Sequence, residues 1–320
     1  MADPSADGAW PVDTLPEHWR LPSGRVLLTG ANGHLGQRLV RALGKRMLVR
    51  ALVRSERAKA QVEQAAADTP VEIRVGRYDD PSVLADALTD CEYAVHLVGI
   101  IKESRSNSFH QAHVATTAAL VQAATAQGLK RLVYLSIVGA DRDHANPALA
   151  SKATAESLLL EAPVPATIFR VPMVLGEGDY ASAALAARGR SKRALTLRAA
   201  SLEQPIYAGD VVRAVVQSLL DSRTENRLLE LPGPEQLSRA ALIERAGAVL
   251  NNHPAVTSLP VSLGLLAAGL LEKVSANPPI TRAMLGVLDH DDTADGGAAA
   301  AYLDFSLVPL NEMLQRCLTA

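Results

Sequence analysis

Three glycines that follow a short apolar segment constrain this 320-residue chain more than any other feature of its sequence. The segment Arg25–Thr29 reads RVLLT, and Gly30, Gly33 and Gly36 come directly after it. A short apolar run closed by glycine is typical of a buried parallel strand, and residues 34–46 carry apolar side chains at helical spacing. The pattern therefore predicts a strand, a tight turn and a helix.

Strands and helices alternate along the first half of the chain. Further strands are expected at 47–53, 71–75, 93–98, 131–136 and 166–171, and further helices at 83–88, 114–126 and 153–160. Alternation at this pace predicts an α/β fold with a doubly wound parallel sheet, because right-handed crossovers join its parallel strands. After about Gly176 the pattern loosens, and we expect helices at 210–220 and 237–250 and a strand at 227–231.

This organisation gives three parts. Residues 1–22 are expected to form a flexible N-terminal tail. Residues 23–235 form the sheet domain, with an excursion at about 177–205. Residues 236–320 form a smaller, mostly helical C-terminal region that supplies the substrate side.

Composition excludes several classes of protein. The formal net charge is −2 and aromatic residues make up 3% of the chain, which argues against nucleic acid as the main ligand. Two cysteines form neither a disulfide framework nor a zinc site, and their scarcity suits a reducing compartment. No segment has the roughly 18 apolar residues that a membrane span needs, and the acidic N-terminus does not read as a signal peptide. We expect a cytoplasmic protein without a metal, peripheral on a membrane at most.

The glycine-rich turn is suited to binding a dinucleotide. Gly30 permits a tight turn, Gly33 leaves room for a pyrophosphate, and Gly36 lets the helix lie close to the strand. Backbone N–H groups at the start of the helix then face the phosphates, at the positive end of the helix dipole. The predicted cofactor-binding residues of the turn are Gly30, Asn32, Gly33, His34, Leu35 and Gly36.

The spacing T-G-x-x-G-x-x-G of this turn resembles that of the short-chain dehydrogenase/reductase superfamily. Further segments occur in the order that superfamily uses: HLVGIIKE at 96–103, SKATAE at 151–156, TIFRVPMVLGEGD at 167–179 and PIYAGDVVRAVV at 205–216. Together they are most similar to the atypical subgroup that contains the nucleotide-binding accessory subunit of respiratory complex I and its bacterial relatives. The resemblance runs from about Val26 into the segment NPPITRAMLGVL. It implies a Rossmann fold, a nicotinamide dinucleotide, and a link to respiratory-chain or quinone-related membrane proteins.

The end of the second strand bears on the choice of nicotinamide cofactor. Enzymes that use NAD usually place a carboxylate there, about twenty residues after the glycines. This chain has Arg54 and Ser55, which suit the 2′-phosphate of NADP, although Glu56 is a nearby carboxylate. We therefore predict NADP(H) rather than NAD(H). The resemblance also places Gly99 beside the cofactor ribose, and it puts Arg77 where relatives commonly have an aspartate that meets adenine.

The catalytic set that the resemblance implies is incomplete. Active members use a tyrosine four residues before a lysine, with a serine near the end of the fifth strand, because the reaction needs a proton donor of tuned pKa. Lys152 and Ser136 match, but Ala148 stands at the tyrosine position and has no proton to donate. Ser151 beside Lys152 has a hydroxyl but, being unassisted, is a poor acid. Other side chains that we consider as donors, without a spacing argument, are His34, Lys102, Glu103, His144 and Tyr180.

Other patterns favour ordinary structural roles. His110 and His113 lack a third metal ligand and are expected on a helix surface or in the core, and His96 is expected to be buried and hydrogen-bonded. The basic stretch Arg188–Arg198 reads as a solvated face, with an anionic lipid or a phosphate-bearing partner as the alternative. The apolar stretch Pro260–Leu271 reads as a packed helix, with a membrane interface or a quinone-tail groove as the alternative.

Three hypotheses for the function follow. The first is an NADP(H)-binding protein without ordinary carbonyl reduction, in which the cofactor is a structural or sensing ligand. The second is an active NAD(P)-dependent oxidoreductase or epimerase-like enzyme with a substituted proton donor. The third is an interaction module that docks onto a membrane complex.

Overall fold

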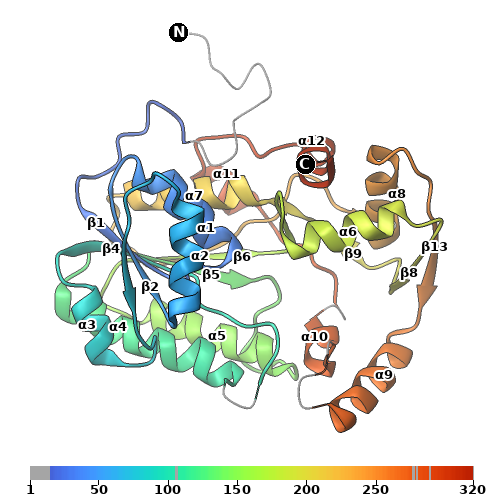
Figure 1. Cartoon of the computed structure of the whole chain (residues 1–320), viewed down its shortest axis with the longest axis horizontal. Coiled ribbons are helices and arrows are strands. Elements are labelled where there is room, and N and C mark those ends of the chain that lie inside the picture. Colours follow the sequence, from blue (N-terminus) through green and yellow to red (C-terminus); the bar gives the residue numbers. More distant parts are fainter. Residues whose placement is uncertain (1–14, 105–106, 276–277, 279, 288–289, 320) are drawn as a thin grey trace.

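A seven-stranded parallel sheet forms the centre of the computed structural model, which describes residues 15–104, 107–275, 278, 280–287 and 290–319. The strand order is β11-β6-β5-β4-β1-β2-β3, so the sheet is doubly wound on either side of β1 and β4 (Figure 1). Its strands are β1 (Arg25–Thr29), β2 (Leu48–Val53), β3 (Glu72–Val75), β4 (Cys91–His96), β5 (Arg131–Ile137), β6 (Ala166–Val171) and β11 (Arg227–Glu230). The α/β doubly wound fold that the alternation predicted is confirmed.

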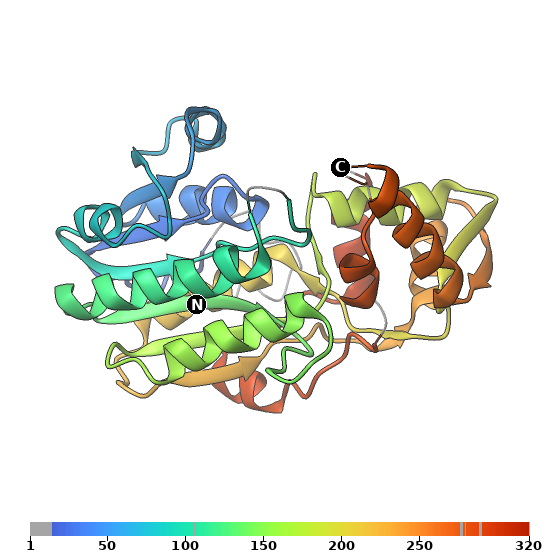
Figure 2. The ribbon, with the colours of Figure 1, turned by 90° about the horizontal axis from the view of Figure 1, so that it is seen from below.

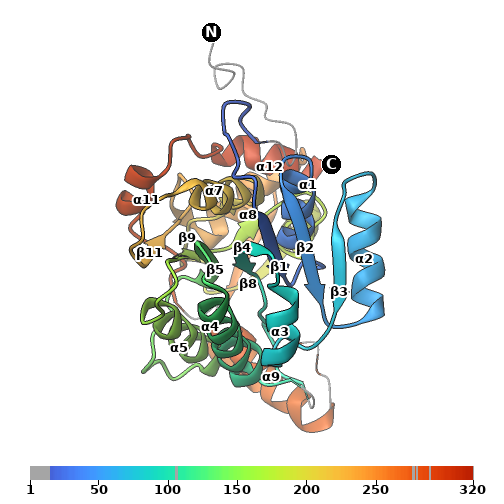
Figure 3. The same ribbon diagram turned by 90° about the vertical axis from the view of Figure 1, so that its left-hand side faces the viewer.

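Helices cover both faces of the sheet (Figure 3). One face is covered by α1 (His34–Gly44), α2 (Glu56–Ala66) and α7 (Ala208–Leu220), and the other by α3 (Pro81–Ala87), α4 (Thr116–Gln127) and α5 (Pro147–Leu160). A single π-helical turn, η2 (His110–Ala115), leads into α4. Burying both faces explains why the strands are continuous apolar runs.

Two helices of this layer differ from the prediction. The helix α2 was not expected, because its sequence ERAKAQVEQAA has only a narrow apolar side, formed by residues such as Ala58 and Val62 that face the sheet. The helix α5 begins at Pro147 rather than at 153. The Asn146 side chain caps it by accepting from the Ala148 N–H at 2.9 Å, and proline is well tolerated in the first turn. Position 148 therefore lies inside the helix that carries Lys152.

A second, smaller core lies beyond the carboxyl end of the sheet (Figure 2). It packs α6 (Tyr180–Arg190), α8 (Arg239–Val249) and α12 (Leu310–Thr319) together with β8 (Arg193–Leu197) and β13 (Ala255–Leu259). Short pairs join the two parts: β7 (Val174–Leu175) with β10 (Ile206–Tyr207), and β9 (Leu202–Glu203) with β12 (Leu237–Ser238). The predicted excursion and the C-terminal region thus form one unit that faces the sheet.

Two terminal segments return to the main sheet. Leu15 and Trp19 are buried in the main core, and the Trp19 indole donates to Asp304 at 3.1 Å. Residues 15–22 of the predicted tail are therefore packed, whereas residues 1–14 lie outside the described residues. The helix α11 (Gly297–Tyr302) buries Ala299 in the same core.

The helix α9 (Val261–Val274) extends away from both cores, and α10 (Arg282–Val287) contacts both α9 and α5 (Figure 1). In α9 only Ala268 is buried, while Leu263, Leu266, Leu270 and Val274 expose between 55% and 82% of their surface. The expectation of an ordinary packed helix over Pro260–Leu271 was wrong, because a whole apolar side of α9 has no partner among the described residues. None of the helices that the structure describes combines the length and apolar character that a bilayer crossing requires.

Candidate functional site

The glycine-rich turn joins β1 to α1 at the carboxyl end of the sheet. Gly30 has φ of +75°, which L side chains rarely adopt. A Cβ on Gly36 would lie 2.6 Å from both the Gly30 carbonyl oxygen and the Ala31 Cα, so no side chain fits between α1 and the turn. The backbone therefore requires glycine where the sequence predicted it.

The first turn of α1 has no side-chain cap. Gly33 is the N-cap residue and contributes no hydrogen-bonding side chain, so the N–H groups of the first turn remain available to an anionic ligand. Asn32 borders this position, where its side chain donates to Gln61 at 3.2 Å, and Leu35 packs against the main core. These amides lie where the sequence predicted a phosphate-binding turn.

The His34 side chain faces the C-terminal unit. Its Nε2 accepts from Arg38 Nε at 3.0 Å and lies 3.9 Å from Asp179 Oδ2. A Cβ on Gly176 would come within 2.9 Å of the same nitrogen. The buried Arg38 also pairs with Glu177 at 2.6 Å, which ties α1 to the segment before α6. His34 thus contributes its backbone to the turn, and its imidazole joins the two units.

The end of β2 presents a cation and a hydroxyl to solvent. Arg54 is exposed, and no ion pair links its guanidinium to another described residue. Ser55 caps α2 by accepting from Ala58 N–H at 3.3 Å. The Glu56 carboxylate is 78% exposed and lies 3.9 Å from Lys59. The nearby carboxylate is thus turned toward a lysine of its own helix.

Tyr78 is a residue of this region that sequence reasoning missed. Its hydroxyl contacts the backbone of Gly30 and of Arg54, and burial raises its pKa to about 12. The preceding Arg77 pairs with Asp79 at 2.8 Å, so its charge is already matched. The signal was available in the sequence, since Tyr78 comes shortly after the end of a predicted strand, where parallel strands place ligand-binding residues.

Lys152 lies at the centre of a second group of residues. A Cβ on Gly99 would lie 3.6 Å from His113 Nε2 and 3.9 Å from Lys152 Nζ, so β4, η2 and α5 converge there. The Lys152 ammonium donates to the Tyr134 hydroxyl at 2.9 Å and to the Leu135 carbonyl at 2.6 Å. Burial lowers the pKa of Lys152 to about 7. The structure thus brings together the predicted residues Gly99 and Lys152.

His113 belongs to this group, although no functional role was predicted for it. Its Nε2 accepts from the Ile100 N–H at 3.1 Å, so the ring proton is on Nδ1, which donates to Ser151 Oγ at 2.8 Å. Ser151 in turn donates to the Ala148 carbonyl at 3.0 Å. Burial lowers the pKa of His113 to about 3. His113 therefore orients Ser151 and does not act as a base toward it. Its place in a π-helical turn, a distortion frequent at functional sites, is not visible in the sequence.

Ala148 and Ser136 are the remaining positions of the predicted catalytic set. Ala148 is buried in the first turn of α5, and its methyl group has no proton to donate. Ser136 shares a face of β5 with Tyr134, and its Oγ is buried without a hydrogen-bond partner among the described residues. An unpaired buried hydroxyl is rare in folded proteins and is a mark of a ligand-binding position.

A family model described as the NmrA-like family matches residues 22–262, three quarters of the chain. The chain belongs to the NmrA-like family. Among curated proteins, this NmrA-like protein is 27% identical to a ceramide reductase of Caulobacter vibrioides, over 89% of the chain and 98% of that protein. It is also 27% identical to the mitochondrial NADH dehydrogenase (ubiquinone) 1 alpha subcomplex subunit 9 of Arabidopsis thaliana, over 88% of the chain and 73% of that protein.

Solved structures share the fold of this NmrA-like protein. The UDP-glucuronic acid 4-epimerase of Bacillus cereus, in complex with UDP-glucuronic acid and NAD, superposes with a TM-score of 0.71 at 17% identity and covers 92% of the chain and 98% of the epimerase. The resemblance to atypical short-chain dehydrogenases/reductases is confirmed. Among the solved structures that share its fold is an epimerase with bound NAD.

The remaining candidate proton donors of the NmrA-like protein have other contacts. Lys102 donates to the Pro278 carbonyl at 2.8 Å, and Glu103 accepts from the Phe109 N–H at 2.8 Å. His144 accepts from the Asn146 N–H at 2.9 Å, and Tyr180 is 84% exposed at the start of α6. No group of three potential metal ligands occurs in the part of the chain that the structure describes.

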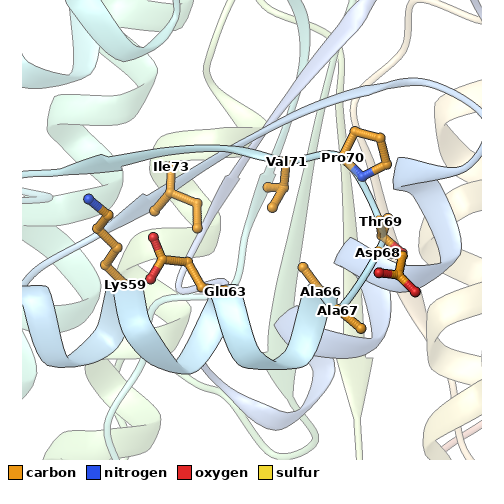
Figure 4. A pocket seen from close by; sticks show the side chains of 9 residues that line it. All are labelled: Lys59, Glu63, Ala66, Ala67, Asp68, Thr69, Pro70, Val71 and Ile73. Atoms are coloured by element: carbon orange, nitrogen blue, oxygen red, sulfur yellow. The ribbon is translucent and has the colours of Figure 1, made fainter.

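His96 has the structural role that the sequence predicted. It is buried, shares a hydrogen bond of 2.7 Å with Thr29 and stacks on Tyr134 at 5.6 Å between ring centres. A hollow of about 560 Å³ between α2 and β3 is lined by Lys59, Glu63 and the 66–71 loop (Figure 4). This loop precedes β3, so the hollow lies toward the amino ends of the strands, whereas the glycine turn lies at their carboxyl ends.

Proposed function

We propose that this protein binds NADP(H) along the carboxyl ends of β1, β2, β4 and β5. The observation that carries the proposal is the glycine turn, where Gly36 has no room for a Cβ and the first turn of α1 has no side-chain cap. Backbone N–H groups around Gly33 and Leu35 would hold the diphosphate, helped by the helix dipole. Bound dinucleotide would supply a nicotinamide ring that accepts or gives a hydride.

Arg54 and Ser55 support NADP over NAD. The Arg54 guanidinium and the Ser55 hydroxyl provide donors for a 2′-phosphate, while Glu56 is directed toward Lys59. Gly99 leaves space for a ribose next to Lys152, so Lys152 is the residue we assign to the nicotinamide ribose.

Ala148 supports a role without tyrosine-dependent carbonyl reduction. Its methyl group occupies the position from which a tyrosine would protonate the substrate, and Ser151 is held by His113 and by a carbonyl. The dinucleotide then serves as a structural or sensing ligand, as the first hypothesis states.

Thermal unfolding with and without dinucleotide tests this function. NADPH at 100 times its dissociation constant is expected to stabilise the protein by about 2.7 kcal/mol, and the same concentration of NADH by less. Native mass spectrometry of the purified protein should show NADP(H) bound one to one. If neither dinucleotide raises the unfolding temperature, the proposal is wrong.

A second candidate function is an active NAD(P)-dependent oxidoreductase with a substituted proton donor. Ser136 favours it, because a buried hydroxyl without a partner is available to a substrate oxygen. The ceramide reductase relative matches over almost its whole length, which suggests an uncharged ketone as substrate. NADPH oxidation by a ketone or quinone panel, abolished in Lys152→Ala without loss of folding, would support this candidate.

A third proposal concerns partners and location. The unpartnered apolar side of α9 and the relationship to a subunit of NADH dehydrogenase favour a cytoplasmic protein that contacts respiratory-chain or quinone-related proteins at the inner face of the membrane. Co-sedimentation with membranes, reduced in the double variant Leu266→Gln/Leu270→Gln, is the expected result. Equal sedimentation of a folded double variant would contradict it.

A further inference from the structure

The segment after α10 places a histidine against the turn that follows β5. A Cβ on Gly139 would lie 2.7 Å from His290 Nε2 and 3.2 Å from its Cδ2, so the imidazole occupies the space that a side chain would take. Gly139 also has φ of +78°. The turn therefore depends on glycine twice, once for its backbone and once for the approach of His290.

Hydrogen bonds of His290 and of the two residues that follow it fix its position. Its own carbonyl accepts from Ser201 Oγ at 3.2 Å. The next residue, Asp291, accepts from the Leu202 N–H at 3.0 Å, and Asp292 accepts from the Met173 N–H at 2.6 Å. The histidine is thus held between the C-terminal unit and the carboxyl end of β6 rather than carried on a free loop.

The hydrogen-bonding capacity of the imidazole is not filled. Both ring nitrogens are buried, and neither meets the geometry of a full hydrogen bond within the described residues, although the Val138 backbone interacts with the ring and favours its protonated form. Burial lowers the pKa of His290, so the ring is neutral at pH 7 and offers one donor and one acceptor. Buried polar atoms in folded proteins are normally paired, which points to a ligand as the missing partner.

Ser136 lies near the end of β5, three residues before Gly139. Its Oγ is a buried polar atom without a hydrogen-bond partner among the described residues. The intervening residues, Ile137 and Val138, are aliphatic. Two neutral hydrogen-bonding groups separated by aliphatic side chains match an uncharged oxygen-bearing ligand.

The charged groups near His290 already have partners. Arg198 lies 3.7 Å from Asp291, and Glu203 pairs with Arg239, while His144 faces the imidazole from the loop before α5. Asp292 is held by the Met173 N–H and is buried. Among the described residues, no positively charged side chain without an ion-pair partner faces His290. A carboxylate or phosphate ligand would therefore find no counter-charge there.

We propose that His290 is a substrate-binding residue. It would hydrogen-bond the oxygen of an uncharged ketone or secondary alcohol from the side of the C-terminal unit. The inference rests on the second candidate function, hydride transfer at this site. It gives the C-terminal unit a direct role in substrate recognition, because the residue comes from outside the nucleotide-binding sheet.

The test is histidine-selective NMR of the full-length protein, with the His290 resonance assigned by its loss in His290→Phe. Three uncharged carbonyl probes, a short-chain 3-oxoceramide, decylubiquinone and acetophenone, are added with and without NADPH, and pyruvate serves as the charged control. At least one uncharged probe is expected to shift the His290 resonance. Its affinity should fall at least tenfold in His290→Phe and less in His290→Gln, while NADPH affinity stays within twofold of the wild type. His253→Gln, a change at an exposed histidine, should alter neither affinity.

The outcomes separate this inference from cofactor binding. Should no uncharged probe shift the resonance, or should pyruvate shift it equally, the inference falls while NADPH binding stands. Unchanged probe affinity in His290→Phe also overturns it. If NADPH does not bind the wild type, the proposed cofactor function fails, and the resonance still reports on the probes alone. If His290→Phe does not fold, the probe affinity of His290→Gln and the resonance shifts of the wild type decide whether His290 binds the probe.

Discussion

Lys152 Nζ lies 2.9 Å from the Tyr134 hydroxyl and 4.2 Å from the centre of the Tyr134 ring. The lysine that we assign to the cofactor thus rests on a tyrosine buried within the sheet. Tyr134 is fully buried, and burial raises its pKa, so it stays neutral and does not compensate the lysine charge. Glu156, whose charge favours the protonated lysine, is bound to Arg170 at 2.6 Å.

The stability of the unliganded protein is expected to rise with pH because of Lys152. Burial lowers its pKa to about 7 in the folded state, whereas an unfolded lysine titrates near 10.4. Between these values the unfolded chain binds more protons, so unfolding becomes less favourable as pH increases, and below about pH 7 the full cost of the buried charge remains. Urea unfolding of wild type and Lys152→Met at pH 7.0, 8.0 and 9.5 measures the effect. The wild type should gain stability relative to the variant across this range, and a constant difference would contradict the assignment.

Acid should destabilise the protein through two buried histidines. Burial lowers the pKa of His96 and of His113 to about 3, against about 6.5 in an unfolded chain. The unfolded state then binds more protons between these values, so stability is lost as pH falls below 6.5, by at most about 2 kcal/mol per histidine at pH 5. In His113→Gln the loss between pH 7 and pH 5 should be smaller than in the wild type. His253→Gln, at an exposed position, should show the full wild-type loss.

Local sequence patterns were sufficient to predict the sheet and the glycine turn. β1 and the start of α1 were predicted because backbone sterics at Gly30 and Gly36 determine the sequence there. The helix α2 was missed because the prediction relied on apolar periodicity, which is weak in ERAKAQVEQAA, although alanine, glutamate, glutamine, lysine and arginine all have high helix propensity. The packed-helix expectation for α9 was wrong because apolar sequence does not reveal whether a partner element is present.

Side-chain contacts between distant segments were beyond sequence reasoning. His113 and Lys152 meet only because η2 and α5 pack on the same face of the sheet, and the histidine pattern His110/His113 gave no sign of it. His290 reaches Gly139 across 151 positions, and its neighbours in the sequence form no recognisable motif. Lys152, Gly99 and Ser136 could be placed because the resemblance to a family supplied their roles.

Gly36→Ala should abolish dinucleotide binding. The new methyl group would meet the backbone at Gly30 and Ala31, which cannot move aside without opening the turn. We expect a loss of stability on the order of 1–3 kcal/mol and no thermal stabilisation by NADPH. The matched control is Gly269→Ala in α9, where the new Cβ would lie 3.7 Å from the Arg282 side chain at normal contact distance. If Gly36→Ala retains NADPH affinity, the diphosphate does not bind at this turn.

Arg54→Ala should separate the two nicotinamide cofactors. A charge-assisted hydrogen bond contributes about 1.5–3 kcal/mol, so the dissociation constant for NADPH should increase about 10- to 100-fold while that for NADH stays unchanged. Isothermal titration with both dinucleotides measures this. Arg188→Ala, an exposed arginine at the end of α6, should leave both constants unchanged. An equal loss for NADH and NADPH would assign Arg54 to the diphosphate rather than to the 2′-phosphate.

The apolar side of α9 should contribute to binding rather than to folding. Leu266 and Leu270 are 64% and 57% exposed, so the double variant Leu266→Gln/Leu270→Gln loses little buried surface, and its unfolding free energy should stay within about 0.5 kcal/mol of the wild type. Leu285 of α10, which is 7% exposed, provides the contrast, because Leu285→Ala removes a packed side chain and should cost about 2–4 kcal/mol. Co-sedimentation with membrane vesicles should decrease in the double variant. Unaltered sedimentation together with a large loss of stability would show that this side of α9 is part of the fold and not a contact surface.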